Sequence, residues 1–277
     1  MSTIWATTNN KQNQEIRKYF SKHHIDFSCP GFCDSPEFLS VEQKHPKILE
    51  DYARYIDTQK YSEAYIHNAR KKIEVVSSVV RQAVEIDGRL GACVDASGII
   101  GRMLDELGVW NYVPKVTLTV EFPAVSNIST RYFWVLDEGE FTASHAVVVA
   151  PPFGLIDVTI KHQHYSSGEK NYLPELVLCD KYRMDKWEPE DIANGELRQY
   201  LRNKKIGFKH FLKINFPHLL NVMNNFPAKS ITMGGTKIKY VTVAIGGFQD
   251  KLPDITGYKP CGRTALDWFN NDVIPKL

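Results

Sequence analysis

The chain has 277 residues, of which 43% are hydrophobic and 24% are charged, and its formal net charge is +2. This composition is too apolar for a disordered chain, and no apolar stretch is long enough to span a bilayer. Lys and Arg are spread along the whole chain, so nucleic acid is not an expected partner. Short basic runs such as Lys204-Lys205 are expected on solvated helix faces. We therefore expect a globular protein with neither a nucleic-acid nor a membrane partner.

The N-terminus and the cysteines indicate a reducing compartment. The first ten residues contain no basic segment followed by an apolar one, so we expect no secretory signal and a cytoplasmic location. An odd number of widely spaced cysteines argues against a disulfide framework. The five are Cys29, Cys33, Cys93, Cys179 and Cys261. Reduced thiols are expected, which leaves a catalytic cysteine available.

Helical periodicity dominates the first part of the chain. The spacing of apolar residues predicts helices over about residues 10–24, 46–57 and 60–86, the last of which ends at Asp87-Gly88. A further helix begins at Cys93 and closes at Gly108. These segments predict a helical region before the first strand.

The pattern then changes to strand-like alternation. Consecutive strands joined by tight turns predict an antiparallel sheet packed against the preceding helices. The predicted strands cover residues 113–122, 131–137, 143–150 and 155–160, with turns at 137–140 and 151–154. Later segments predict helices over 188–203 and 208–225, the second interrupted at Pro217, and a strand over 237–245.

Three residues fall at positions that suit nucleophilic catalysis. Cys93 opens a helix, where free backbone amides and the positive end of the helix dipole favour a thiolate. The same amides can stabilise an oxyanion. His145 lies in a strand of small and apolar residues, and Asp157 lies in the next strand. Both are about six residues from the turn at Pro151-Pro152, so we expect them to face each other across the hairpin.

Each of these residues alone has an ordinary structural explanation. A cysteine near a helix start is usually a small buried residue, and a histidine in an apolar strand is usually structural. Together, a thiol, an imidazole and a carboxylate in this order predict a Cys-His-Asp triad, in which Asp157 orients and stabilises the imidazolium.

The segments that carry these residues resemble the transglutaminase-like superfamily. Gly91-Ala92-Cys93 followed by a helix closing at Leu104-Asp105-Glu106-Leu107-Gly108 is similar to the nucleophile helix of that family. His145-Ala146-Val147 resembles its His-Ala-Trp segment, and Asp157-Val158-Thr159 resembles its Asp-x-Thr. The resemblance covers about residues 88–160. It implies a papain-like fold with Cys93 as nucleophile, His145 as base and Asp157 as orienting acid.

From pattern and resemblance together we expect an α+β protein with three regions. Residues 1–87 would form a helical N-terminal region and 88–165 the transglutaminase-like core, with an antiparallel sheet packed on the nucleophile helix. Residues 166–277 would form a mixed α/β extension, either part of the same domain or a small second domain. The chain departs from the family at Val147, where many members have Trp.

The rest of the site is less defined. Gln82 on the long helix, Asp95 in the first turn after Cys93 and Trp134 in a strand are candidates for oxyanion or substrate-lining residues. Favourable charge at a helix N-terminus is the simpler explanation of Asp95. Cys29 and Cys33, with His23 and His24 nearby, suggest zinc only weakly because no second ligand pair follows, so neither a metal nor another cofactor is expected.

The predicted activity is acyl transfer from an amide of a peptide or protein through a thioester on Cys93. Water as acceptor would make the enzyme a cysteine peptidase or amidohydrolase, which is the preferred prediction. Three alternatives stay open: a protein transglutaminase or deamidase, an arylamine N-acetyltransferase-like enzyme that uses acetyl-coenzyme A, and a catalytically silent binding module. The oligomeric state is not predicted.

Overall fold

The computed structural model describes residues 8–277 except 138–139, 142–144, 167 and 248–249. The protein is α+β with antiparallel sheets, as the sequence predicts. Its α-helices are α1 (Asn10–Lys22), α2 (Pro36–Glu42), α3 (Ile48–Thr58), α4 (Glu63–Asp87), α5 (Cys93–Glu106), α6 (Pro189–Ile192), α7 (Gly195–Asn203), α8 (Phe208–Asn215), α9 (Pro217–Asn225) and α10 (Ala265–Trp268). Its strands are β1 (Val113–Glu121), β2 (Arg131–Phe133), β3 (Leu136–Asp137), β4 (Glu140–Phe141), β5 (His145–Ala146), β6 (Val148–Ala150), β7 (Phe153–Asp157), β8 (Val177–Cys179), β9 (Arg183–Asp185), β10 (Ala228–Met233) and β11 (Thr236–Gly246).

Most of the predicted helices and strands are confirmed, and the differences are local. The predicted helix over 208–225 is divided into α8 and α9 at Pro217, as expected for a residue that cannot donate a backbone hydrogen bond. The predicted strand over 155–160 is displaced, because β7 begins at Phe153 and ends at Asp157. The predicted turn at 137–140 and the first residues of the strand 143–150 lie partly outside the described residues.

The main sheet has the strand order β2-β1-β11-β10-β9. β11 pairs with β1 over nine positions, so a strand from the predicted C-terminal extension lies beside the first strand of the predicted core. β5 pairs with β1 at Lys115 and Val116, and β2 pairs with later residues on the same side of β1. Directly after β5 the chain enters a second sheet, which has the strand order β6-β7-β8. The segment that bears His145 therefore passes from the first sheet into the second.

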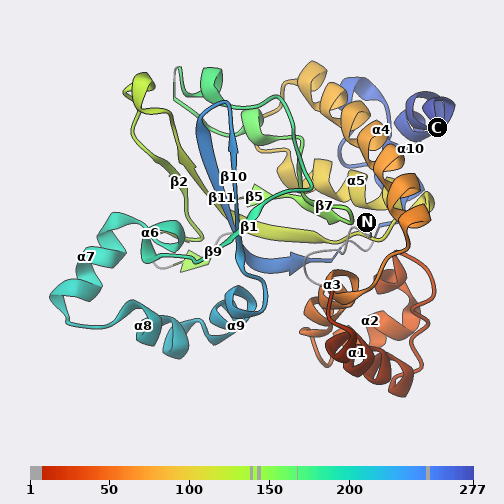
Figure 1. The fold of residues 1–277 in the computed structure, drawn as a ribbon, viewed down its shortest axis with the longest axis horizontal. Coiled ribbons are helices and arrows are strands. Elements are labelled where there is room, and N and C mark those ends of the chain that lie inside the picture. Colours follow the sequence, from red (N-terminus) through yellow and green to blue (C-terminus); the bar gives the residue numbers. More distant parts are fainter. Residues whose placement is uncertain (1–7, 138–139, 142–144, 167, 248–249) are drawn as a thin grey trace.

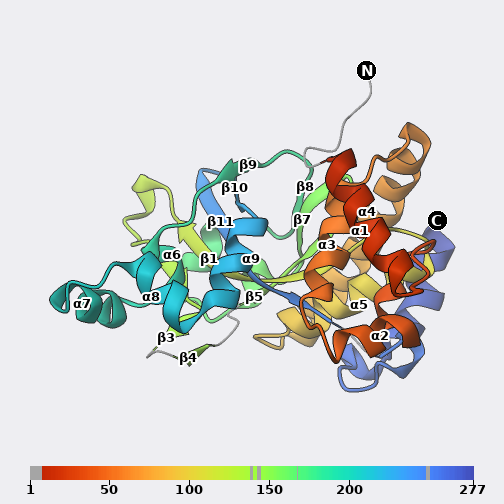
Figure 2. The same cartoon turned by 90° about the horizontal axis from the view of Figure 1, so that it is seen from below.

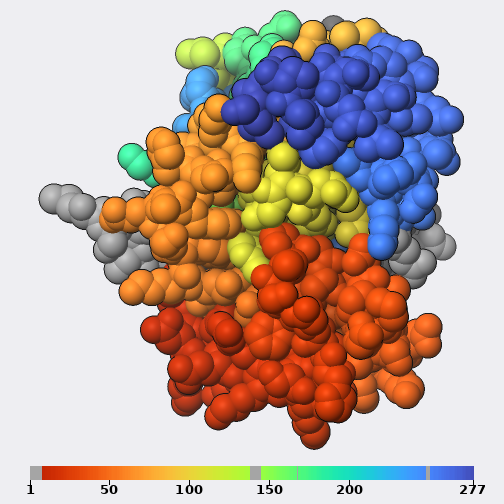
Figure 3. Space-filling model, turned by 90° about the vertical axis from the view of Figure 1, so that its right-hand side faces the viewer, coloured from red at the N-terminus to blue at the C-terminus, as the bar shows by residue number. Residues whose placement is uncertain are grey.

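The helices are grouped at the two ends of the sheets. α1–α3 and the pair α4–α5 lie at one end together with α10, and α6–α9 lie at the other (Figures 1 and 2). The segment around α5 is seen between α4, the N-terminal helices and the C-terminal segment (Figure 3). α5 thus occupies a central position, and its apolar side joins a core shared with α4, β5, β6 and β7.

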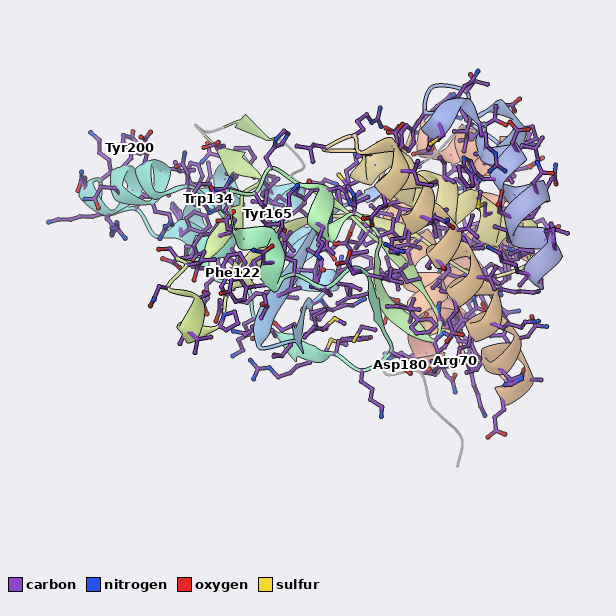
Figure 4. The ribbon with its side chains drawn as sticks, turned by 90° about the horizontal axis from the view of Figure 1, so that it is seen from above. Arg70, Phe122, Trp134, Tyr165, Asp180 and Tyr200 are labelled. Carbon is purple, nitrogen blue, oxygen red and sulfur yellow. The ribbon has the colours of Figure 1, made fainter. Side chains whose placement is uncertain are left out.

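α4 is fixed at both ends and along its length. Ser62 caps its first turn by accepting a hydrogen bond from Tyr65 N, and Gly88, at φ +69°, ends it in the left-handed conformation that glycine adopts freely. Arg70 on α4 forms an ion pair with Asp180, 2.7 Å away, which follows β8 (Figure 4). The helix that precedes Cys93 is thereby tied to the second sheet. Among the described helices, none has the length and apolar character needed to cross a membrane.

Candidate active site

Cys93 is the first residue of α5 and lies just after a tight turn. Gly91 has φ +72°, which an L side chain rarely adopts, and its N–H donates to the carbonyl of His162 at 2.9 Å. This bond attaches the loop before Cys93 to the segment that follows β7. The thiol therefore has a fixed position at the N-terminus of α5, where the first backbone N–H groups have no partner inside the helix.

Strand β5 is held against the first turn of α5. Ser97, one turn after Cys93, donates from its hydroxyl to the carbonyl of Ala146 at 3.1 Å. The backbone N–H of Ala146 lies close enough to the sulfur of Cys93 to lower the pKa of the thiol. Two contacts from one face of the helix therefore place β5, and with it His145, beside the thiol.

His145 and Asp157 form the buried part of the site. His145 Nε2 lies 2.7 Å from Asp157 Oδ2, and both residues are 1% exposed, whereas Cys93 is 6% exposed. The other ring nitrogen, Nδ1, makes no hydrogen bond among the described residues, and the Cys93 thiol lies near enough to the ring to raise the pKa of His145. The structure thus brings the three predicted residues together, and Cys93 is the most exposed of the three.

The carboxylate of Asp157 is held by two further residues. Its Oδ1 accepts from the backbone N–H of Thr159 at 2.9 Å and from the Thr159 hydroxyl at 3.2 Å. Its Oδ2 also accepts from the hydroxyl of Tyr240 at 3.2 Å. Thr159 belongs to the Asp-x-Thr segment noted in the sequence, whereas the sequence analysis did not identify Tyr240 on β11 as part of the site. Nothing in the local pattern of β11 distinguishes it from an ordinary buried strand tyrosine.

The electrostatics of the site favour a thiolate beside an imidazolium. Burial acts to raise the pKa of the Cys93 thiol, but the hydrogen bond and charge of His145 and the N–H of Ala146 outweigh it and lower that pKa. Burial acts to lower the pKa of His145, but the charge and hydrogen bond of Asp157, and the thiolate of Cys93, raise it to about 10. Each group therefore stabilises the charged form of the other.

Two other cysteines have the opposite environment. Burial raises the pKa of Cys33 to about 12, and burial also raises the pKa of Cys179. Cys29 and Cys261 are exposed and, among the described residues, all five cysteines are free thiols. Cys93 is thus distinguished by its lowered pKa as well as by its neighbours.

The three additional candidates lie away from this chain of contacts. Gln82 is exposed on α4. Asp95 forms an ion pair with Arg89 on the surface of the first turn of α5. Trp134 donates from its indole N–H to the carbonyl of Glu190 at 2.8 Å, on the side of the sheet that carries α7 and Tyr200 (Figure 4). Trp134 lines a 730 Å³ pocket beside α7, which is formed by other residues than the triad.

No cluster of metal ligands is present in the described part of the chain, where no three His, Cys, Asp or Glu side chains are placed to hold an ion together. The two cysteines of the weak zinc motif have different environments, since Cys29 is exposed while Cys33 is packed near Tyr52 and Arg102. Neither a family model, a curated protein nor a solved structure matches this chain. The functional argument therefore depends on the geometry of the site.

Proposed function

We propose that the protein is a cysteine-dependent acyl-transfer enzyme that acts on an amide through a Cys93-His145-Asp157 triad. The observation that supports it most strongly is the buried 2.7 Å contact between the imidazole of His145 and the carboxylate of Asp157, beside a thiol at a helix N-terminus whose pKa is lowered. A purely structural cysteine in this position would have its pKa raised by burial, as at Cys33.

The proposed mechanism begins with transfer of the Cys93 proton to His145. The sulfur attacks the carbonyl carbon of the amide, a C–S bond forms, and the carbonyl electron pair moves to oxygen. The backbone N–H groups at the start of α5 stabilise this oxyanion. The oxyanion collapses, the C–N bond breaks, and His145 gives its proton to the departing amine. An acyl thioester remains on Cys93.

Deacylation returns the enzyme to its starting state. A water molecule attacks the thioester carbon while His145 accepts its proton, the C–S bond breaks and the thiolate is restored as the acid leaves. With water as acceptor the protein is a cysteine peptidase or amidohydrolase of papain-like, transglutaminase-type fold, acting on a peptide or protein. The helix that carries the thiol packed against β5 and its sheet is the arrangement that supports this fold assignment.

The test is to capture the acyl-enzyme. The protein is incubated with a peptide library or cell extract, and the mass attached to Cys93 is identified by mass spectrometry. An adduct on the unmodified chain that is absent from Cys93→Ala supports the proposal. A labelled primary amine in the mixture reports the acceptor, because its appearance in the product identifies a transglutaminase.

Other outcomes separate the remaining alternatives. An acetyl group that appears on Cys93 only with acetyl-coenzyme A identifies an acetyltransferase. The absence of any adduct, together with alkylation of Cys93 by iodoacetamide that is no faster than that of the exposed Cys29 and Cys261, overturns the proposal and leaves a binding module.

A further inference from the structure

Tyr240 and His145 project from the same face of the main sheet. β1 lies between β5 and β11, with Val116 opposite His145 on one side and Leu118 opposite Tyr240 on the other. Residues two apart on a strand point to the same face, and directly opposed residues share a face. The side chains of His145 and Tyr240 are therefore neighbours across β1, although they come from distant parts of the sequence.

Asp157 reaches this face from the second sheet. It is the last residue of β7, which pairs with β6 and β8 and not with the main sheet. Its Oδ2 accepts from His145 Nε2 at 2.7 Å and from the Tyr240 hydroxyl at 3.2 Å. One carboxylate oxygen thus receives two donors, both of them carried by the main sheet.

We propose that Tyr240 is a positioning residue, which acts on the Cys93-His145 pair by fixing the carboxylate of Asp157 between the two sheets. This inference depends on the proposed function. Thr159 holds only Oδ1, so that without the Tyr240 hydroxyl the imidazole itself would have to orient Oδ2. A carboxylate held by donors outside the reacting pair keeps its position while the charge of His145 changes during the reaction.

The environment of Tyr240 suits this role. The residue is 2% exposed and packs in the apolar cluster that also contains Val116 and Leu118. Burial, and then the charge of Asp157, raise its pKa well above the ordinary value, so the phenol remains a donor throughout the range in which Cys93 titrates. The titratable groups whose pKa the charge of Asp157 affects include Cys93, His145, His162, Tyr165 and Tyr240.

The experiment measures the rate at which iodoacetamide modifies Cys93 as a function of pH, with the site resolved by mass spectrometry. Tyr240→Phe removes one hydroxyl and keeps the ring. We expect the rising limb of its profile to move to higher pH by about half to one unit, and the rate on that limb to fall about three- to tenfold. Loss of a packing contact alone would lower stability without moving the profile.

The chain contains a matched control. Tyr112 is also buried, and its hydroxyl donates to Asp57 Oδ2 at 2.9 Å, outside the chain of contacts that contains Cys93. Tyr112→Phe should lower stability and leave the Cys93 profile where it is. In an Asp157→Asn background, Tyr240→Phe should change the rate by less than about twofold, because its effect passes through Asp157.

The outcomes separate this inference from the proposed function. Rapid modification of Cys93 in the unmodified protein, with an unchanged profile in Tyr240→Phe, overturns the inference alone. So does an effect of Tyr240→Phe that persists undiminished in Asp157→Asn. If Cys93 in the unmodified protein reacts no faster than Cys29, this inference falls, and the proposed function falls with it when no acyl adduct forms on Cys93 either. If Tyr240→Phe does not fold, Tyr240→Met gives the same test, since its flexible side chain fills the space without a donor.

Discussion

His145 and Asp157 meet at 2.7 Å although they belong to different sheets. β5 pairs with β1, and β7 pairs with β6 and β8, so the contact crosses from one sheet to the other. Both side chains are removed from solvent, which strengthens the interaction between imidazolium and carboxylate. This contact raises the pKa of His145 despite its burial, and the predictions for the thiol follow from it.

Removing His145 should reverse the direction of the Cys93 pKa shift. In His145→Ala the burial that raises the thiol pKa remains, and the main interactions that lower it are lost. We expect the thiol to titrate above its ordinary value of about 8.5. The ultraviolet absorbance of the thiolate, taken as the difference between each protein and its Cys93→Ser counterpart, measures this. His162→Ala serves as the control, and an unchanged titration in His145→Ala would contradict the prediction.

Stability should fall at alkaline pH because of the Cys93-His145 pair. In the folded protein the pair keeps one proton up to a pH of about 10, the pKa of His145. In the unfolded chain His145 loses its proton near pH 6.5 and Cys93 near pH 8.5, so between about 8.5 and 10 the folded state binds more protons. The free energy of unfolding should decrease there by about 2 kcal/mol in total.

The lowered pKa of Cys93 contributes to stability with the opposite sign. A thiol that ionises more readily in the folded state adds stability that is present above its unfolded pKa and is lost as the pH falls through its folded pKa. Urea denaturation across the pH range, compared with Cys93→Ser/His145→Gln, isolates both effects. Identical pH dependence in the two proteins would exclude an ion pair at this site.

Arg102 should be required for folding stability. It is 5% exposed on α5, and its Nη1 lies 3.2 Å from Asp105 Oδ2 and 3.3 Å from Asp34 Oδ2. Its Nε donates to the carbonyl of Asp250 at 2.9 Å. Arg102→Met leaves the two carboxylates without this cation, and we expect a loss of about 3–5 kcal/mol in urea denaturation.

A surface pair is the control for Arg102. Arg81 pairs with Glu85 at 2.8 Å along the exposed side of α4, and Arg81→Met should change stability by no more than about 0.5 kcal/mol. Equal effects of the two substitutions would show that the buried network around Arg102 contributes no more than a solvated ion pair.

Gly154 should not tolerate a larger residue. A Cβ at this position would lie 2.0 Å from Cε1 of Tyr182, so the ring would have to move away from β7. We expect Gly154→Ala to cost about 1–3 kcal/mol of unfolding free energy. Gly154→Ala/Tyr182→Leu should recover part of that loss, and Gly195→Ala, which meets no atom within 4 Å, should be nearly neutral. If the single and double variants are equally stable, the ring is not the obstacle.

The fold could be predicted from the sequence wherever the residues within a single helix or strand carry the pattern that identifies it. The apolar spacing along α4 and α5, the glycine at the end of α4 and the alternation in β1 are local properties, and the structure has helices and a strand there. The short strands β8, β9 and β10 were missed. Their few residues carry little periodicity, and their pairing depends on strands elsewhere in the chain.

The candidate site, too, has one part that the sequence predicts and another part that only the tertiary structure decides. The sequence alone predicted Cys93 at a helix start and a contact between His145 and Asp157. The expected geometry of that contact, across one hairpin, was wrong, because His145 belongs to the main sheet and Asp157 to the second sheet. Only the tertiary structure brought in Tyr240, 83 residues from Asp157, because the register of β11 on β1 is set by packing between distant strands. It also decided the protonation of the pair, since the pKa of a buried group depends on which charges and donors the fold gathers around it.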